Sequence, residues 1–455
     1  MTTTYDVRIW AIEVYEGKRT QTYWVCWKVA GERQKEPFKT VALAESFRSD
    51  LIAASRKGEA FEVETGLPVS MRRKNASMSW YELACSFADM KWPHVAATTR
   101  RTHAEALTAL TVLMLTGTRG RPDGKLLRYA LGRWAFNTAR RTGQDVPERV
   151  RLALDWVKRN SRNVSSLSRP DVLRPVLDGL TVRLDGKPAA PSVISRRRKI
   201  FNTALEYGVE KRLLSANPLP DLKWKPPKIV TTIDKRSVAN PVQARTLLEG
   251  VREQGRIGPR MVAFYACLYY AAMRPEEAVR LAKSNLHLPK EGWGEFILDG
   301  ADPYAGSEWT DSGKNRDSRQ LKQRARGETR TAPCPPELTA IINAHIELFG
   351  YGPNGRLFIG ERNKEDLPKG TINRVWRDAR RAVLVPEVAT SPLAATPYDL
   401  RHAAVSTWLN EGVPATQVAE WAGQSVEVLL RIYAKCLDGG VADLRRRVER
   451  ALGHG

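Results

Sequence analysis

The sequence predicts a mainly α-helical protein with small β elements, an α+β fold. Three observations predict this class. Aromatic and β-branched residues cluster near the N-terminus, helical periodicity runs through most of the remaining chain, and a proline-rich basic stretch at residues 216–240 interrupts it. We therefore expect a sheet-plus-helix domain at residues 1–65, an all-helical domain at residues 76–222, and a mixed helical domain with a β-hairpin at residues 240–455.

The N-terminal domain is expected to contain a hairpin, a third strand and a helix. Residues 7–15 and 22–29 are rich in aromatic and β-branched residues and predict the hairpin. A short strand near residues 37–40 and a helix at residues 43–54 follow. Basic side chains in this domain favour DNA as the partner if they are exposed, and the alternative is a small β domain that binds protein or nothing. These side chains are Arg8, Lys18, Arg19, Lys28, Arg33, Lys35 and Lys39.

Residues 80–214 follow a helical pattern, after a basic linker at residues 66–76. The last helix of this part, at residues 192–209, has an apolar face and a basic outer face. Such a face is either solvated or bound to phosphates, which position a protein on DNA without reading its sequence. The candidate DNA-binding residues are Arg196, Arg197, Arg198 and Lys199 on this helix, and Lys223, Lys225 and Lys228 in the proline-rich stretch.

The composition favours a polyanionic partner. Lys and Arg outnumber Asp and Glu by 73 to 50, a net charge of +23, which is more than solubility needs. A membrane surface is the alternative, but the longest apolar run, residues 261–273, is too short to span a bilayer and indicates a buried helix. The first residues lack the features of a secretory signal. Five scattered cysteines without a C-x-x-C pair predict reduced cytoplasmic thiols and no zinc site.

Two arginines are expected at helix N-termini. Arg274 is followed by a proline and two glutamates, and Arg401 follows a Thr-Pro-Tyr-Asp capping sequence at residues 396–399. The free N–H groups and the dipole of a helix N-terminus favour anions. Both guanidiniums are therefore expected where a phosphate can be received, although either one alone is more often a solvated or ion-paired surface group.

A tyrosine and a lysine complete the predicted set. Residues 412–433 predict a turn, a helix that stops at Gly423 and a second helix with Tyr433 on its apolar face, where a core tyrosine is the alternative. Residues 293–299, 318–324 and 329–333 predict strands, the last two forming a hairpin that carries Lys322. Lys314, which lies in a polar loop, is the alternative candidate for the lysine of the site. We prefer Lys322 because a loop holds a fixed geometry less readily.

The joint pattern resembles the tyrosine recombinase (phage integrase) family, particularly site-specific integrases of actinobacterial type. Its parts are Arg-Pro-Glu-Glu at residues 274–277, the hairpin lysine, Tyr-Asp-Leu-Arg-His at residues 398–402, Trp-Ala-Gly-Gln-Ser at residues 421–425, and Tyr433. The similarity in layout extends over nearly the whole chain. It implies an arm-type DNA-binding domain, a core-binding domain and a catalytic domain with a C-terminal tail helix, in the three ranges given above.

The resemblance implies site-specific recombination, the integration or excision of a mobile element. Tyr433 would attack a DNA phosphodiester and form a 3′-phosphotyrosyl linkage with a free 5′-hydroxyl. Arg274 and Arg401 would clamp the non-bridging oxygens and stabilise the phenolate, because a free tyrosine has a pKa of about 10. Lys322 would protonate the leaving oxygen. Rejoining would need no cofactor, ATP or metal, because the phosphodiester is held covalently.

Two positions depart from the pattern of the family. The family usually has histidine or lysine where this chain has Tyr398, and histidine or tryptophan where it has Gln424. Both side chains donate a hydrogen bond, but neither offers an imidazole proton. Glu277 is expected to orient an arginine or His402, and its alternative role is that of a helix-start acid.

The resemblance also implies partners and leaves two alternatives open. The implied partners are double-stranded DNA attachment sites, a homotetramer on DNA and, as an open question, a directionality factor, in a cytoplasmic, nucleoid-associated location. A tail helix at residues 441–452 would dock on a neighbouring subunit through Val441, Leu444, Val448 and Leu452. The alternatives are a catalytically impaired DNA-binding accessory protein of the same architecture, and a type IB topoisomerase that relaxes DNA as a monomer.

Overall fold

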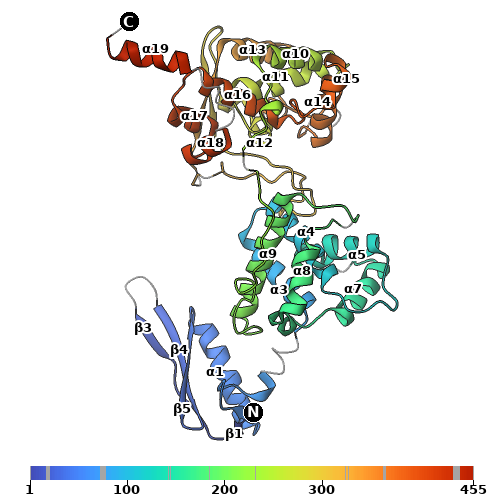
Figure 1. Ribbon diagram of the computed structural model, residues 1–455, viewed down its shortest axis with the longest axis vertical. Coiled ribbons are helices and arrows are strands. Elements are labelled where there is room, and N and C mark those ends of the chain that lie inside the picture. The colour runs from blue at the N-terminus through green and yellow to red at the C-terminus, as the bar shows by residue number, and fades with distance from the viewer. Residues whose placement is uncertain are drawn as a thin grey trace. The chain divides into compact units, whose positions relative to one another are not determined.

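The chain forms a mainly helical α+β fold with small antiparallel sheets, as predicted (Figure 1). It divides into two compact units, Met1–Val95 with Thr99–Lys228 and Ala96–Thr98 with Ile229–Gly455. The predicted division into three domains stays a prediction. The computed structural model describes residues 2–16, 21–71, 78–141, 143, 145–183, 185–230, 232–322, 324–325, 327–361, 365–433 and 441–453, with no side-chain description at 441–444 and 447.

A four-stranded sheet and a helix form the N-terminal part. The long strand β4 (Gln21–Val29) pairs with β5 (Glu32–Phe38) on one side and with β2 (Val7–Ile9) and β3 (Glu13–Glu16) on the other. Helix α1 (Val41–Arg56) packs Ala44, Leu51 and Ala54 against Val25, Trp27 and Val29 of β4. The short strands β1 (Thr3–Thr4) and β6 (Phe61–Glu62) pair separately.

The prediction for the third strand was wrong in its length. It was expected near residues 37–40, but β5 begins at Glu32. Ala30 and Gly31 both have positive φ, 49° and 88°, so they form a two-residue turn whose twist matches that of the paired strands. The predicted first strand is also divided, into β2 and β3. Lys18 and Arg19 lie outside the described residues.

The helical part of the first unit is built around aromatic residues. Helix α3 (Trp80–Lys91) begins with a capping box between Ser79 and Glu82, and Trp80 packs edge-on against Phe201 of α9 at 5.4 Å between ring centroids. The other helices are α4 (Ala97–Leu113), α5 (Gly124–Ala130), a π-helical turn (Leu131–Ala135), α6 (Thr138–Arg141), α7 (Glu148–Asn160), α8 (Pro170–Gly179) and α9 (Pro191–Glu210). Arg72, Arg73 and Lys74 of the predicted linker lie outside the described residues.

The second unit is organised around α11 (Gly258–Tyr270), which is buried along nearly its whole length. The predicted buried helix is thus confirmed. A helix that is apolar on all sides packs at the centre of a domain. Around α11 pack α10 (Pro241–Arg252), α13 (Pro336–Phe349), α14 (Lys369–Val383) and α16 (Tyr398–Asn410). Within the described residues, no helix has the length and apolar character to cross a membrane.

The predicted hairpin around Lys322 was wrong. Strand β8 (Gly294–Leu298) pairs with β7 (Leu286–His287) and with β9 (Arg330–Cys334), which confirms two of the expected strands. Residues 318–322 and 324, the described part of this segment, form no strand, and Arg319 makes an isolated bridge with Ala301. The backbone of residues 315–319 is instead bonded to residues 301–306: Ala301 and Arg319 donate to each other's carbonyls, and Asp317 donates to the carbonyl of Pro303. Helix α17 (Ala415–Ala422) packs against β9.

The C-terminal helices follow the predicted order. After α15 (Pro386–Ala389), helix α16 begins behind Thr396, whose backbone N–H and hydroxyl both donate to Asp399. Helix α17 ends at Gly423, with φ of 63°, and α18 (Val426–Tyr433) follows (Figure 1). The tail helix α19 (Val441–Ala451) carries the exposed side chain of Val448, and the exposed Leu452 follows its last residue. The side chains of Val441 and Leu444 lie outside the described ones.

Candidate active site

Arg274 caps helix α12 (Pro275–Arg280) and is itself buried, with 8% of its surface exposed. Its backbone N–H donates to Glu277 Oε2 at 2.9 Å, and its Nη1 donates to Glu277 Oε1 at 2.6 Å. Its Nη2 donates to the carbonyl of Gly423 at 2.6 Å. Arg274 therefore joins the start of α12 to the end of α17, which lies 149 residues away in the sequence.

Arg401 lies near the start of α16, 1% exposed, and donates to the carbonyls of Ala272 and Ala422. Ala272 has a φ of 48°, a left-handed conformation that costs a non-glycine residue about 1–3 kcal/mol and that persists only where the surrounding structure imposes it. The two predicted arginines thus hold adjacent carbonyls, those of residues 422 and 423, which would otherwise be unsatisfied at a helix C-terminus. The sequence-distant guanidiniums come together at this point.

Arg330 is a third arginine of the cluster, and the sequence reasoning missed it. It is 2% exposed on β9, its Nη2 donates to Glu277 Oε2 at 2.6 Å, and its Nη1 donates to the carbonyl of Trp421. The strand alternation places Arg330 on the same face as buried Ala332, with exposed Thr331 between them. That alternation was the available signal that this arginine points inward.

Glu277 lies at the centre of the three guanidiniums and is 1% exposed. Burial by itself raises the pKa of this carboxyl, but the attraction of Arg330, Arg274 and Arg401 outweighs burial and lowers the pKa to about 2. The expectation that Glu277 orients an arginine agrees with its bonds to Arg274 and Arg330. Burial and the neighbouring guanidiniums lower the pKa of Arg330 to about 10, which still leaves it charged at neutral pH.

The cluster carries an excess of positive charge. Three guanidiniums surround one carboxylate, which leaves a formal charge of +2 in a largely buried place. The Nε2 atom of neighbouring Gln424 is buried and has no hydrogen-bond partner. A buried excess of charge is costly unless an anion balances it, and a buried N–H group needs an acceptor. The arrangement is therefore suited to an oxyanion.

Tyr433 lies beside this cluster in its own chain. It is 1% exposed and packs with Ala272, Ala404 and Ala422, which border both arginines in sequence or in space. Its hydroxyl lies 2.8 Å from Nδ1 of His402, the residue after Arg401. The ring of Tyr433 is buried, which agrees with the alternative that this residue is a core tyrosine. Its hydroxyl, however, has a polar partner next to the guanidiniums.

His402 lies between two tyrosines. Its ring centroid is 5.7 Å from that of Tyr433 and 5.0 Å from that of Tyr398, and both contacts are edge-on. Burial, and then the charge of Arg401, lowers the pKa of His402 to about 4, so the imidazole is neutral at pH 7. Tyr398 is 36% exposed at the start of α16 and lies near Arg274.

The two candidate lysines are both exposed. Lys322 lies in a turn after the buried Leu321, and Lys314 lies in a loop where its carbonyl accepts a hydrogen bond from the hydroxyl of Thr310 at 2.6 Å. In the part of the chain that the structure describes, no hydrogen bond or ion pair joins either lysine to the arginine cluster. The preference for Lys322 over Lys314 stays a prediction.

The predicted DNA-binding residues differ in their surroundings. Arg196, Lys199, Lys223, Lys225 and Lys228 are exposed. Arg197 instead donates to the carbonyls of Leu180 and Val182, at 3.2 and 3.3 Å, and the Nε atom of Arg198 is buried without a partner. The described residues contain no group of three His, Cys, Asp or Glu side chains that could hold a metal.

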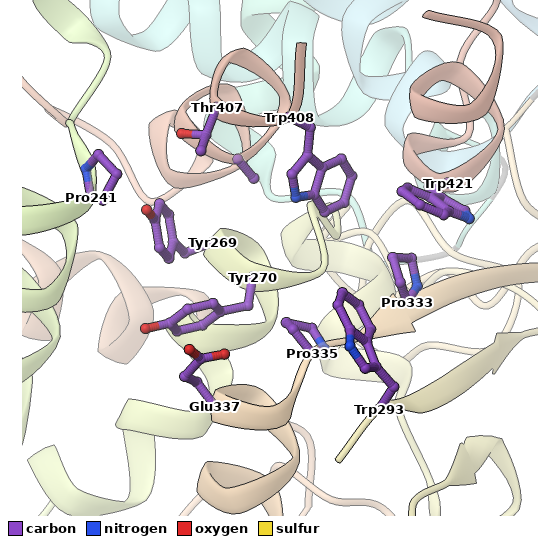
Figure 2. A pocket seen from close by; sticks show the side chains of 11 residues that line it. Pro241, Tyr269, Tyr270, Trp293, Pro333, Pro335, Glu337, Thr407, Trp408 and Trp421 are labelled. Carbon is purple, nitrogen blue, oxygen red and sulfur yellow. The ribbon is translucent and has the colours of Figure 1, made fainter. Parts of the chain in front are cut away.

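An aromatic pocket of about 240 Å³ lies on another side of α17 (Figure 2). Trp293, Trp408 and Trp421 line one part of it, and Tyr269 and Tyr270 line another. It contains none of the predicted catalytic side chains. Trp421 connects the two places, because its ring faces the pocket and its carbonyl accepts the hydrogen bond from Arg330.

Comparisons with known proteins found likenesses among solved structures. No protein-family model matches the sequence, and no curated protein matches it. The chain is similar to the Tn1549 transposon integrase in complex with a circular intermediate DNA, at 15% identity and a TM-score of 0.46, over 67% of this chain and 96% of that one. It is similar to the XerH site-specific recombinase bound to palindromic difH substrate, at 10% identity and a TM-score of 0.42, over 78% and 96% of the two chains. A lambda integrase dimer bound to a COC′ core site gives 11% identity and a TM-score of 0.42, over 90% and 91%.

Proposed function

We propose that the protein is a tyrosine recombinase that breaks and rejoins DNA strands at specific sites, with Tyr433 as the nucleophile. The observation that supports this most is the buried cluster of Arg274, Arg330 and Arg401 around Glu277, next to the hydroxyl of Tyr433. A phosphodiester carries one negative charge, which reduces the formal excess of +2. Attack adds negative charge to the non-bridging oxygens, and guanidiniums held in place beforehand stabilise it without reorganising.

The site residues have distinct roles in this proposal. Arg274 and Arg401 receive the non-bridging oxygens with the N–H groups that their carbonyl and carboxylate partners leave free, since each guanidinium has five donors. Gln424 donates from Nε2, which is buried and has no partner in the free protein. Tyr398, exposed next to Arg274, donates from its hydroxyl. Arg330 and Glu277 touch no substrate and position the other groups.

The chemical step exchanges one phosphodiester for another. The Tyr433 oxygen bonds to phosphorus, the bond from phosphorus to the 5′-oxygen breaks, and a 3′-phosphotyrosyl linkage forms. Lys322 supplies the proton to the leaving 5′-oxygen, and its exposed turn leaves it free to approach a bound duplex. Attack by a 5′-hydroxyl of another strand then reverses these bonds and completes strand exchange.

The assembly around the DNA belongs to the same proposal. Arg196, Lys199 and the lysines of the proline-rich stretch contact phosphates, and the N-terminal sheet binds arm-type DNA. The partners are double-stranded attachment sites of a mobile element, four copies of this chain on DNA, and, where excision is controlled, a directionality factor. The net charge of +23 supports such a partner and a location at the bacterial nucleoid in the cytoplasm.

A nicked DNA substrate tests the proposal. Labelled duplexes that span the repeats bordering the element carry a nick next to the scissile phosphate, so the short 5′-hydroxyl fragment diffuses away and traps the covalent complex. We expect a denaturation-resistant protein–DNA complex that Tyr433→Phe abolishes and that Tyr304→Phe, at an exposed tyrosine outside the cluster, leaves unchanged. Its absence from the unaltered protein would favour the accessory-protein alternative. Relaxation of plasmids without exchange between two sites would favour the topoisomerase.

A further inference from the structure

We propose that His402 is the base that removes the hydroxyl proton of Tyr433 during strand cleavage. This inference rests on the proposed function and assigns a role to the imidazole that faces the nucleophile. The Nδ1 atom of His402 lies 2.8 Å from the Tyr433 oxygen, within the range for direct proton transfer.

The surroundings of His402 keep the imidazole in the accepting form. The groups that face it are Arg401 and Tyr398 on its own helix and Tyr433 on α18. Burial and the positive charge of Arg401 both disfavour an imidazolium, so the imidazole is neutral at pH 7. In the tautomer with its proton on Nε2, which the proposal requires, Nδ1 has a lone pair and accepts from the phenol. An imidazolium at this place would donate to the Tyr433 oxygen and would block proton transfer.

A bound phosphodiester makes His402 a stronger base. The phosphate bears a negative charge next to Arg401, which reduces the repulsion between that guanidinium and an imidazolium. The tyrosine proton becomes more acidic as its oxygen bonds to phosphorus. Both changes bring the two proton affinities together only when substrate is in place, which is the condition for efficient general-base catalysis.

Tyr398 is less suited to this role. It lies one helical turn before His402, and its ring contacts the imidazole edge-on at 5.0 Å. A phenol hydroxyl oxygen is a much weaker base than a neutral imidazole nitrogen, so it is a poor acceptor for the proton of a second phenol. We therefore assign to Tyr398 the packing of the imidazole ring, in addition to its proposed bond to the phosphate.

The protons balance over the two steps. In cleavage, the proton of Tyr433 passes to Nδ1 of His402, and Lys322 protonates the leaving 5′-oxygen. In rejoining, the incoming 5′-hydroxyl gives its proton to Lys322, its oxygen bonds to phosphorus, and the bond from phosphorus to the tyrosine oxygen breaks. The imidazolium then returns its proton to that oxygen. No oxidant, metal or additional co-reactant takes part.

The test compares variants of His402 in single-turnover cleavage of the nicked duplex described above. His402→Ala is expected to slow formation of the covalent complex by about 10²–10⁴-fold, the usual contribution of a general base, with unchanged duplex affinity. Added imidazole is expected to restore part of the rate. His402→Phe retains the ring packing and cannot accept a proton, so it should be equally slow and insensitive to imidazole.

A modified leaving group separates His402 from Lys322. A duplex with sulfur in place of the scissile 5′-oxygen has a leaving group that needs no proton, so it should rescue Lys322→Ala and leave His402→Ala slow. The limb of the pH–rate profile that falls towards acidic pH should disappear in His402→Ala.

The proposal for His402 is overturned if His402→Phe cleaves within threefold of the unaltered protein, or if sulfur substitution rescues His402→Ala. It is distinguished from failure of the proposed function by Tyr433→Phe. If that variant still forms the covalent complex, Tyr433 is not the nucleophile and both proposals fall. If it forms none while His402→Phe remains fast, only the role of His402 is refuted.

Discussion

Glu277 is the residue on which the arginine cluster depends. Its two carboxylate oxygens accept from Arg274 and Arg330, and both of those guanidiniums also hold the end of α17. Glu277 is an acidic residue at the start of a helix, yet its contribution to stability comes from contacts with strands and helices that are far away in the sequence. Two tests follow from its burial and charge.

Replacing Glu277 by glutamine should unfold the protein more easily. Glu277→Gln leaves three buried guanidiniums without a carboxylate, and breaking a buried ion pair on one side costs about 3–5 kcal/mol. Urea denaturation measures the change in the free energy of unfolding. The matched control is Glu276→Gln, one residue earlier and only partly buried, which should cost less than about 1 kcal/mol. Equal effects of the two variants would contradict the proposed role of Glu277.

Acid should weaken the folded state in two partly overlapping pH ranges. His402 has its pKa lowered from 6.5 to about 4, so between these values the unfolded chain binds a proton that the folded chain does not. The free energy of unfolding should fall by about 3 kcal/mol as the pH falls through this range, because each pKa unit corresponds to about 1.4 kcal/mol. Glu277 contributes a further loss below its ordinary value of 4.5, down to about pH 2.

Denaturation curves at successive pH values measure these contributions. His402→Gln should reduce the loss between pH 6.5 and 4 and retain the loss below pH 4 that comes from Glu277. Burial also lowers the pKa of His103 and of His345, so these two residues keep part of the loss above pH 4. A His402→Gln protein whose stability has the same slope as the unaltered protein between pH 6.5 and 4 would show that another group takes up the proton.

At the scale of elements, the turn between α17 and α18 is the feature that brings the site together. Gly423 ends α17 with φ of 63°, and its carbonyl and that of Ala422 accept from the two predicted arginines. A methyl group on Gly423 would lie 2.7 Å from Nε of Arg330, which is pinned by Glu277 and Trp421. Glycine is therefore needed at this position for two reasons: the backbone has a positive φ, and Arg330 leaves no space for a methyl group.

Gly423→Ala should reduce both stability and cleavage. The left-handed conformation costs alanine about 1–2 kcal/mol, and the contact with Arg330 adds to it. Gly313→Ala is the control, because Gly313 has a similar φ of 68° and nothing within 4 Å of the added methyl group. Urea denaturation and covalent trapping of nicked DNA are the measurements. We expect a larger loss for Gly423→Ala, and equal losses would mean that Arg330 tolerates the methyl group.

The strand expected at residues 318–324 shows what local pattern does not decide. Its composition was compatible with a hairpin partner for β9, but β8 occupies one edge of β9, and buried Arg316 is held by the carbonyls of Asp302 and Leu367. The backbone of residues 315–319 is bonded to residues 301–306, so contacts that form only in the folded unit decide where this segment lies. The short turn at Ala30 and Gly31 was also missed, because the residue type of an alanine does not indicate a positive φ.

For the whole molecule, the charge of +23 is expected to appear in the salt dependence of DNA binding. Arg196 and Lys199 are exposed on α9, whereas Arg197 between them is occupied by two carbonyls of its own unit. Replacing both exposed residues by alanine should reduce the slope of log affinity against log salt by about 2, because each phosphate contact contributes roughly 0.9. Arg197→Ala should instead lower stability and leave the slope nearly unchanged.

Titrations of a labelled duplex at several salt concentrations measure these slopes. A larger change of slope for Arg197→Ala than for the double variant would place the DNA on a different face of α9. Lys223, Lys225 and Lys228, all exposed, provide a second set for the same measurement.

The sequence by itself determined the fold class, the buried central helix and the helix starts at which Arg274 and Arg401 lie, because periodicity and capping residues act over a few positions. Only the tertiary structure decided that Arg330 joins them, that one glutamate holds two of the guanidiniums, and that His402 meets the hydroxyl of Tyr433. The contact of Arg330 with Glu277 joins segments separated by 53 residues, and that of His402 with Tyr433 joins segments separated by 31 residues. Folding selects them through burial and charge balance across the whole unit, which no local pattern records.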